Sequence, residues 1–169
     1  MKEKRELYDI NRNPSGVIIY KGESIPEDLY EMMVSIFIEN SDGELLIQKR
    51  SEDKGGKWAT TGGHPKAGES CLEGIVNEVY EEMGINLDYK NIELIEETTF
   101  KNKMGCLYFI KQDININDCI LQEEEVSHVK WASVDEIFNM IQNNEFHKSH
   151  CLLFKSYLNY INQNVKKVI

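Results

Sequence analysis

The stretch GHPKAGESCLEGIVNEVYEEMGI, residues 63–85, decides the fold of this chain. It begins in a tight loop at Gly62-Gly63, because glycine lets the backbone turn sharply and approach a ligand closely. Ser70, followed by Glu73 three residues later, has the pattern of a capping box at the start of a helix. Gly84 marks the end of that helix, since glycine readily takes the left-handed conformation found there. The stretch therefore predicts a glycine loop that leads directly into one helix.

The predicted helix has an apolar face and an acidic face. At about 100° per residue, one face carries Leu72, Ile75, Val76, Val79 and Met83. Glu78, Glu81 and Glu82 lie on the other side, at spacings that bring side chains together within one turn. Such carboxylates repel one another unless a cation lies among them, and Mg²⁺ suits oxygen ligands beside a phosphate. A solvated acidic helix face is the alternative that the helix alone leaves open.

Residues 63–85 resemble the Nudix box, G-x5-E-x7-R-E-U-x-E-E-x-G-U, in which U is a bulky aliphatic residue. Eight of the nine defined positions agree: Gly63, Glu69, Glu78, Val79, Glu81, Glu82, Gly84 and Ile85. The exception is Asn77, which stands where the box has an arginine. The resemblance implies one α/β (α+β) domain over residues 1–169, a Nudix-like α/β/α sandwich with a mixed β-sheet covered by helices. The chain up to ELLIQKRS is also similar to a bacterial Nudix branch related to isopentenyl-diphosphate isomerase.

The resemblance implies Mg²⁺-dependent cleavage of a phosphoanhydride, with Mn²⁺ as a substitute metal. Glu78 and Glu82 would ligate the metal, and the carbonyl of Gly63 would be a further ligand. Glu81 would ligate the metal or act beside it as a catalytic residue. Glu69 would lie near the site and support the helix and the metals. The expected substrate is a diphosphate linked to another moiety, a nucleoside diphosphate derivative being the expected class.

Nudix proteins often add an acid from a loop some residues before a strand tryptophan. Glu125 lies six positions before Trp131 and is therefore the expected additional catalytic residue. Glu124 is the second choice. A solvated acidic loop remains the alternative for both.

Three residues are candidate substrate contacts. Lys49 and Arg50 end a predicted strand just before a loop, and arginine binds phosphate oxygens with two parallel hydrogen bonds. A solvated strand end is the alternative interpretation. His64 follows Gly63 directly, so it either contacts a phosphate or caps the loop.

Asn77 removes a charge from the box, because an amide offers two donors where a guanidinium offers a charged, rigid fork. In the family this arginine holds the glutamates of the box in position. Without it we expect a looser carboxylate cluster before metal binds, or another cation in its place. Lys66 and Lys57 are the candidates for that cation.

Two other functions remain open. An isopentenyl-diphosphate isomerase would need a cysteine just before the loop glycine, and this chain has Gly62 there. A non-catalytic diphosphate-binding module is the other alternative, and Asn77 is its support. The box itself does not identify the group attached to the diphosphate.

Composition narrows the classes of partner. The chain has 169 residues and a net charge of −10, which argues against nucleic-acid or anionic-membrane binding. It has no apolar run long enough to span a bilayer and no secretory leader, so a cytoplasmic location is expected. Four cysteines, at 71, 106, 119 and 151, lack metal-site spacing and are expected to be buried free thiols. A homodimer is left open.

The rest of the chain reads as strands and two more helices. Residues 1–16 are rich in charge, and Pro14 and Gly16 are expected to interrupt regular secondary structure there. Apolar runs and turn signals predict strands at 17–20, 31–39, 44–50, 58–61, 92–101, 105–112 and 126–131. Ser133 and Glu136 predict a second capping box, and Ser149 is a candidate cap for the last helix.

Overall fold

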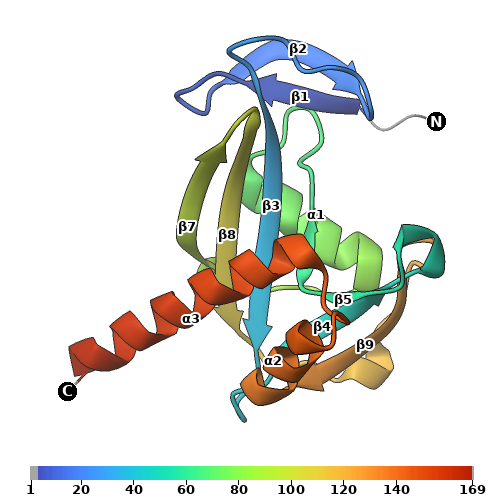
Figure 1. Cartoon of the computed structure of the whole chain (residues 1–169), viewed down its shortest axis with the longest axis vertical. Helices are drawn as coiled ribbons and strands as arrows, with labels where there is room; N and C mark the ends of the chain where they lie inside the picture. The colour runs from blue at the N-terminus through green and yellow to red at the C-terminus, as the bar shows by residue number, and fades with distance from the viewer. Residues whose placement is uncertain (1–3, 169) are drawn as a thin grey trace.

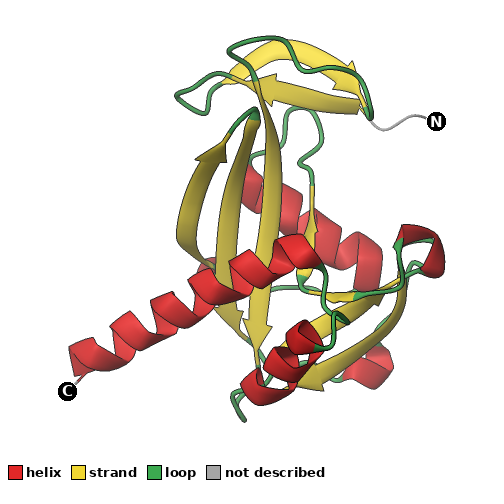
Figure 2. Cartoon of the chain, viewed as in Figure 1, coloured by secondary structure: helices red, strands yellow, loops and turns green. Residues whose placement is uncertain are grey.

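The computed structural model describes residues 4–168 as a mixed β-sheet with helices on both faces (Figures 1 and 2). Its strands are β1 (Lys4–Tyr8), β2 (Pro14–Tyr20), β3 (Tyr30–Glu39), β4 (Leu45–Arg50), β5 (Trp58–Ala59), β6 (Thr61–Gly63), β7 (Glu93–Phe100), β8 (Lys103–Lys111) and β9 (Val126–Ala132). Its helices are α1 (Cys71–Met83), α2 (Val134–Gln142) and α3 (Lys148–Val168), with short 3-10 turns η1 (Glu52–Lys54), η2 (Tyr89–Asn91) and η3 (Ile116–Asp118). The predicted fold class is confirmed. None of the helices in this described part is long and apolar enough to cross a membrane.

Strand β3 is the centre of the sheet. It pairs in parallel with β8 over nine residue pairs, from Glu31 with Lys103 to Glu39 with Lys111. It also pairs antiparallel with β1, β4 and β6. In Figure 1 this long strand runs from the N-terminal hairpin at the top to the edge near α2. One strand therefore holds the hairpin, the glycine loop and the second half of the chain together.

Two apolar cores lie on opposite faces of the sheet. Ile36 and Ile38 of β3 pack with α1 on one face, whereas Phe37 packs with α2 and α3 on the other. This alternation follows from the two-residue period of a strand, and a strand covered on both faces is apolar throughout. Phe37 and Tyr157 of α3 lie 5.0 Å apart between ring centroids. Strand β8 shows the same alternation, with Cys106, Tyr108 and Ile110 in one core and Leu107 and Phe109 in the other.

Helix α1 begins and ends where the sequence predicts. The Ser70 hydroxyl accepts a hydrogen bond from the Glu73 backbone N–H, and the Glu73 carboxylate accepts one from the Ser70 N–H, which closes the capping box. Gly84 takes the left-handed conformation at φ +70°. The apolar face is packed against the sheet, with Ile75 and Val79 fully buried.

The N-terminal hairpin corrects the expectation for residues 1–16. Lys4–Tyr8 forms strand β1, and β2 begins at Pro14 rather than at residue 17. Proline is tolerated as the first residue of a strand. The charged sequence of β1 gives little local strand signal, and the strand exists because it pairs with both β2 and β3. Residues 1–3 lie outside the described part.

Three other boundaries differ from the prediction. The segment 58–61 is two strands, because β5 pairs with β4 and β6 pairs with β3. The turn between β7 and β8 lies at 101–102, and Lys101 adopts a left-handed φ of +54° there. Ser149 lies inside the first turn of α3 and is not its cap.

Side chains settle two further predictions. Ser133 caps α2 as expected, but the Glu136 carboxylate accepts a hydrogen bond from Lys130 at 2.6 Å. The four cysteines are free thiols, as predicted. Only Cys106 is buried, while the other three are half-buried.

The capping box makes a testable contribution to stability. Replacing Ser70→Ala removes the acceptor for the Glu73 N–H, and we expect the free energy of unfolding to fall by about 1 kcal/mol. Chemical denaturation followed by circular dichroism measures this change. Ser41→Ala, in an exposed turn after β3, is the matched control and should leave stability unchanged. Equal stability of the two variants would contradict the assigned role of the cap.

Candidate active site

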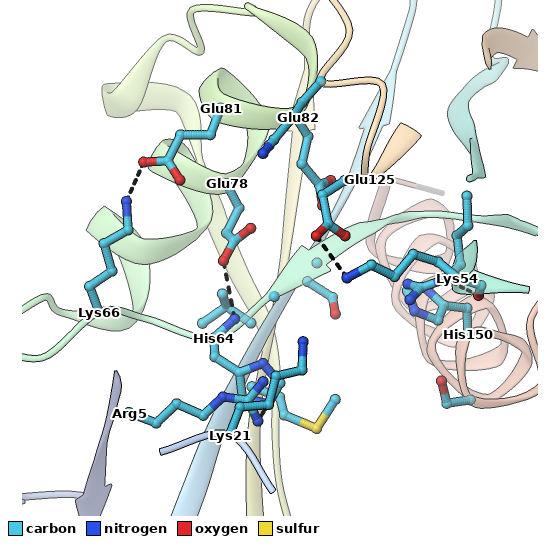
Figure 3. Close-up of a pocket in the computed structure, with 18 of the residues that line it drawn as sticks. Arg5, Lys21, Lys54, His64, Lys66, Glu78, Glu81, Glu82, Glu125 and His150 are labelled. Carbon is cyan, nitrogen blue, oxygen red and sulfur yellow. Dashed lines mark hydrogen bonds and ion pairs between the residues drawn. The ribbon is translucent and has the colours of Figure 1, made fainter. Parts of the chain in front are cut away.

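A cleft of about 440 Å³ lies between the N-terminal hairpin, the exposed side of α1 and the start of α3 (Figure 3). Acidic side chains line one wall, and basic side chains from distant parts of the chain surround them. The acidic group is Glu78, Glu81, Glu82 and Glu125; the basic group is Lys4, Arg5, Lys21, Arg50, Lys54 and Lys66; the histidines are His64, His147 and His150. The cleft therefore combines oxygen ligands for a cation with cations for an anionic ligand.

Gly63 and Glu78 are in close contact. A Cβ atom built on Gly63 would lie 2.2 Å from Glu78 Oε1, so any larger residue here would displace the Glu78 carboxylate from its present position. The Glu78 carboxylate accepts a hydrogen bond from the His64 backbone N–H at 3.2 Å. Strand β6 holds this loop in place through the pairing of Gly63 with Val34 of β3. The glycine that begins the box motif thus brings the loop backbone against a carboxylate of the helix.

Glu82 is the buried carboxyl of the cleft and is 7% exposed. Its Oε2 accepts a hydrogen bond from Gln48 Nε2 at 2.7 Å, and Gln48 Oε1 accepts one from the Thr61 hydroxyl at 2.9 Å. Burial raises the pKa of Glu82 from its ordinary 4.5 to about 7, and the charge of Glu125 acts in the same direction. A buried carboxyl of this kind ionises readily only when a cation is supplied.

Lysines hold the other two carboxylates. Glu81 is ion-paired with Lys66, and Lys54 Nζ lies 2.8 Å from Glu125 Oε1 (Figure 3). The helical spacing therefore does not make all the box glutamates converge, because Lys66 draws Glu81 aside. Within residues 4–168, no three histidine, cysteine or acidic side chains are already grouped as a metal site. Metal binding would require the carboxylates to exchange these partners.

Asn77 and Glu69 form a separate contact beside the cleft. Asn77 Nδ2 donates a hydrogen bond to Glu69 Oε1 at 2.9 Å, and Glu69 Oε2 accepts one from the Lys66 N–H at 2.8 Å. Glu69 thus ties the loop to the helix and does not line the cleft. Lys66, one of the two candidates for the cation that replaces the box arginine, is ion-paired with Glu81. Lys57 instead donates to Asn144 Oδ1 at 2.8 Å.

His64 is held from behind by a buried ion pair. Arg5 of β1 is paired with Glu31 of β3, and His64 Nε2 lies 3.5 Å from Glu31 Oε1. Hydrogen bonding to His64 and then to Arg5 outweighs burial and lowers the pKa of Glu31 to about 2. Glu31 is therefore ionised and fixes two potential phosphate contacts on the cleft wall.

Some of the predicted site residues line the cleft and others do not. Arg50, a predicted phosphate contact, lines the cleft, and its Nε donates to the Lys54 carbonyl at 3.2 Å. Lys49 does not line it and lies 3.7 Å from Glu52. Glu125 lines the cleft whereas the second choice, Glu124, does not. The cations of the N-terminal hairpin, together with His147 and His150 at the start of α3, were missed, because no local motif marks them.

Gly62 has no room for a side chain. A Cβ atom there would lie 2.6 Å from Ser35 Oγ and 2.7 Å from the Val34 carbonyl oxygen. The backbone atom of Val34 belongs to the central strand and cannot move aside cheaply. A cysteine at this position would therefore require the loop to shift away from β3.

Comparison with known proteins identifies the family. Residues 29–153 match the family model described as the NUDIX domain. The chain therefore belongs to the Nudix family, and its class is that of the Nudix pyrophosphohydrolases.

Two curated relatives and one solved structure are similar to most of the chain. An uncharacterized Nudix hydrolase of Listeria monocytogenes is 29% identical over 149 residues, covering 85% of this chain and 88% of that protein. An isopentenyl-diphosphate Delta-isomerase of Pectobacterium atrosepticum is 31% identical over 145 residues, covering 78% of this chain and 76% of the enzyme. A Deinococcus radiodurans crystal structure has a TM-score of 0.73 at 20% identity, covering 92% of this chain and 99% of that one. That structure confirms the fold.

The raised pKa of Glu82 predicts a pH-dependent stability in the metal-free protein. Below about pH 4.5 the Glu82 carboxyl is protonated whether the chain is folded or unfolded, so its burial does not lower the free energy of unfolding there. As pH rises from there through about 7, only the unfolded chain ionises freely, and stability falls by about 3 kcal/mol. Glu82→Gln should remove most of this loss, making the variant more stable than the wild type at pH 8 but not at pH 4.

Denaturation with a chelator present, at pH 4, 6 and 8, measures the effect. Glu81→Gln is the matched control, because the Glu81 carboxylate is half exposed and paired with Lys66. A gain at pH 8 for the control equal to that of Glu82→Gln would contradict the role of burial at Glu82.

Proposed function

We propose that this protein is a Mg²⁺-dependent hydrolase that cleaves the phosphoanhydride bond of a diphosphate linked to another moiety. A nucleoside diphosphate derivative is the expected substrate class, and Mn²⁺ is the expected substitute metal. The observation that carries the proposal is one cleft in which Glu78, Glu82 and Glu125 are surrounded by six basic side chains. This combination suits a metal ion together with an anionic substrate.

The donor set of the cleft fits a hard divalent ion. Glu78, Glu82 and the Gly63 carbonyl would supply oxygen ligands, and Glu81 and Glu125 lie within the same cleft. The absence of a side chain at Gly63 lets its backbone approach the Glu78 carboxylate. A bound Mg²⁺ would supply charge stabilisation to phosphoryl oxygens and lower the pKa of an attacking water.

The protein's own residues bind and orient the substrate. Arg50 and Lys54 approach the carboxylates from one side, while Arg5 and Lys21 approach from the N-terminal hairpin. Their charges allow a protein with a net charge of −10 to hold a diphosphate. When phosphate oxygens draw Lys54 away, Glu125 is released, and it becomes the candidate base for the attacking water.

Isomerisation of isopentenyl diphosphate is the second candidate function. The relative from Pectobacterium atrosepticum, which bears the name of that isomerase, is the observation that favours it. Against it stands Gly62, at the position where the isomerases need a cysteine. Its contacts with Ser35 and Val34 leave no space for a thiol-bearing side chain. Hydrolysis therefore has the better support.

The reaction class is tested with a substrate panel in ¹⁸O-labelled water. The panel contains nucleoside diphosphate sugars, dinucleoside polyphosphates, nucleoside triphosphates and prenyl diphosphates, each with Mg²⁺ or Mn²⁺. We expect ¹⁸O in a phosphate product of at least one substrate. Interconversion of isopentenyl diphosphate with its allylic isomer, without breakage of a phosphate bond, would show that hydrolysis is the wrong assignment.

Glu78→Gln and Glu82→Gln keep the side-chain shape and remove a ligand charge. We expect each to lower the rate of hydrolysis at limiting Mg²⁺ by at least about 10²-fold, on the order of 3 kcal/mol in activation free energy. Glu123→Gln is the matched control, since this exposed glutamate lies near Glu125 in sequence but outside the cleft. Unchanged turnover in Glu82→Gln would remove the support for the metal site.

Lys66 is expected to compete with the metal for Glu81. Lys66→Gln removes that competing charge, so Mn²⁺ should bind up to about fivefold more tightly, which corresponds to ~1 kcal/mol. Calorimetric titration of the substrate-free protein with Mn²⁺ measures this affinity. Lys57→Gln, whose amine contacts Asn144 away from the cleft, should leave it unchanged. Weaker Mn²⁺ binding by Lys66→Gln would mean that the lysine supports the site instead of competing for it.

A further inference from the structure

Three lining residues of the cleft have no role in the proposed reaction. His147, Ser149 and His150 line it where α3 begins, on the same lining as Arg50 and Lys54; Figure 3 labels His150 and Lys54. The β5 strand fixes this segment, because the His147 N–H donates to the Trp58 carbonyl at 2.7 Å. The two imidazole rings lie 5.2 Å apart between centroids, in an edge-to-face arrangement. A second set of polar side chains is therefore built into the lining of the cleft.

His150 is the unusual member of this group. It is only 8% exposed although it lines the cleft. Within residues 4–168, its Nδ1 is a buried side-chain atom without a hydrogen-bond partner. A buried polar atom left unpaired costs free energy, and native proteins keep few of them. The protein therefore leaves part of the hydrogen-bonding capacity of the His150 ring unused.

The charges around His150 indicate which class of ligand this part of the cleft suits. Burial lowers the pKa of His150 to about 3, and the nearby His147 and Arg50 act in the same direction. The ring is therefore neutral and still carries one N–H donor. The first turn of the 21-residue helix α3 adds a partial positive charge. Glu125, a carboxylate that lines the same cleft, is already paired with Lys54.

We propose that His150, His147 and Arg50 form a subsite for a phosphate group, in the part of the cleft where α3 begins. Hydrogen-bond donors, a guanidinium and a helix start converge there, which favours an anion over an uncharged base or sugar. The group is a phosphate monoester or inorganic phosphate, the two kinds of anion that cleavage of a diphosphate produces. Only this assignment to a reaction product rests on the proposed function.

The test measures phosphate binding without metal and without turnover. The whole protein, in a chelator, is titrated calorimetrically with inorganic phosphate, with adenosine monophosphate and with adenosine. We expect the wild type to bind at least one of the two phosphates and not adenosine. His150→Leu should weaken that binding at least tenfold. His128→Leu, on the exposed side of β9, is the matched control and should bind like the wild type.

The two phosphate arms distinguish the sources of the group. Tighter binding of adenosine monophosphate assigns the subsite to a monoester, and tighter binding of inorganic phosphate assigns it to the free product. The proposal is overturned if neither phosphate binds the wild type at millimolar concentration. It is equally overturned if His150→Leu binds phosphate as tightly as His128→Leu, or if adenosine binds as well as its monophosphate.

A second measurement needs no variant and so does not depend on the folding of His150→Leu. Phosphate should move the imidazole ¹⁵N resonances of His147 and His150 in the wild type and leave those of His128 in place. Unmoved His150 nitrogens at saturating phosphate would refute the subsite. The outcome is independent of the reaction class, because absence of metal-dependent hydrolysis would remove the proposed function while these resonance shifts would still establish phosphate binding.

Discussion

The backbone of β6 touches the central strand on one side and the Glu78 carboxylate on the other, and the cleft depends on this double contact. Gly62 lies against Val34 and Ser35 of β3, and Gly63 lies against Glu78 of α1. The contact with the Val34 carbonyl is between main-chain atoms and leaves no space for a side chain at position 62. The loop is therefore held rigidly against the sheet, while its contact with α1 runs through the Glu78 side chain.

The contact between loop and helix gathers several carboxylates in one cleft, and the protein offsets their negative charge in two ways. Lys66 and Lys54 neutralise Glu81 and Glu125, which lie toward solvent. Glu82 is buried beside Gln48 and is neutral over much of the pH range because its pKa is raised. The fold thus tolerates an acidic cluster through replaceable partners. An amide at position 77 is compatible with this arrangement, because Asn77 bonds to Glu69 and leaves Glu81 to Lys66.

Local signals in the sequence predicted the parts of the structure that depend on neighbouring residues. The capping box at Ser70 and the left-handed Gly84 are of this kind, and both are confirmed. The buried strands were also predicted because their apolar runs reflect coverage on both faces. Strand β1 was missed, since its charged residues become a strand only by pairing with segments distant in sequence.

The same distinction between local signals and contacts distant in sequence applies to the residues of the candidate site. The glutamates of one helix could be placed from their spacing alone. The direction taken by Glu81, however, depends on Lys66 across the loop. Arg5, Lys21, His147 and His150 reach the cleft through tertiary contacts that no single motif encodes. Sequence identity does not separate the two candidate reactions either, since the isomerase relative is 31% identical and the hydrolase relative 29%. The space at Gly62 is the more discriminating observation.

The parallel pairing of β3 with β8 has a consequence for how the chain folds. Each of its residue pairs joins positions 72 apart, as in Glu31 with Lys103. The segment between them contains the glycine loop and α1, so this whole loop must close before the pairing stabilises it. Closing this loop costs chain entropy before the strand contacts form. Proteins dominated by such distant contacts fold more slowly than helical bundles. The 13-residue helix that carries the box is too short to be stable alone, so it becomes a wall of the cleft only when both halves of the chain meet on one strand.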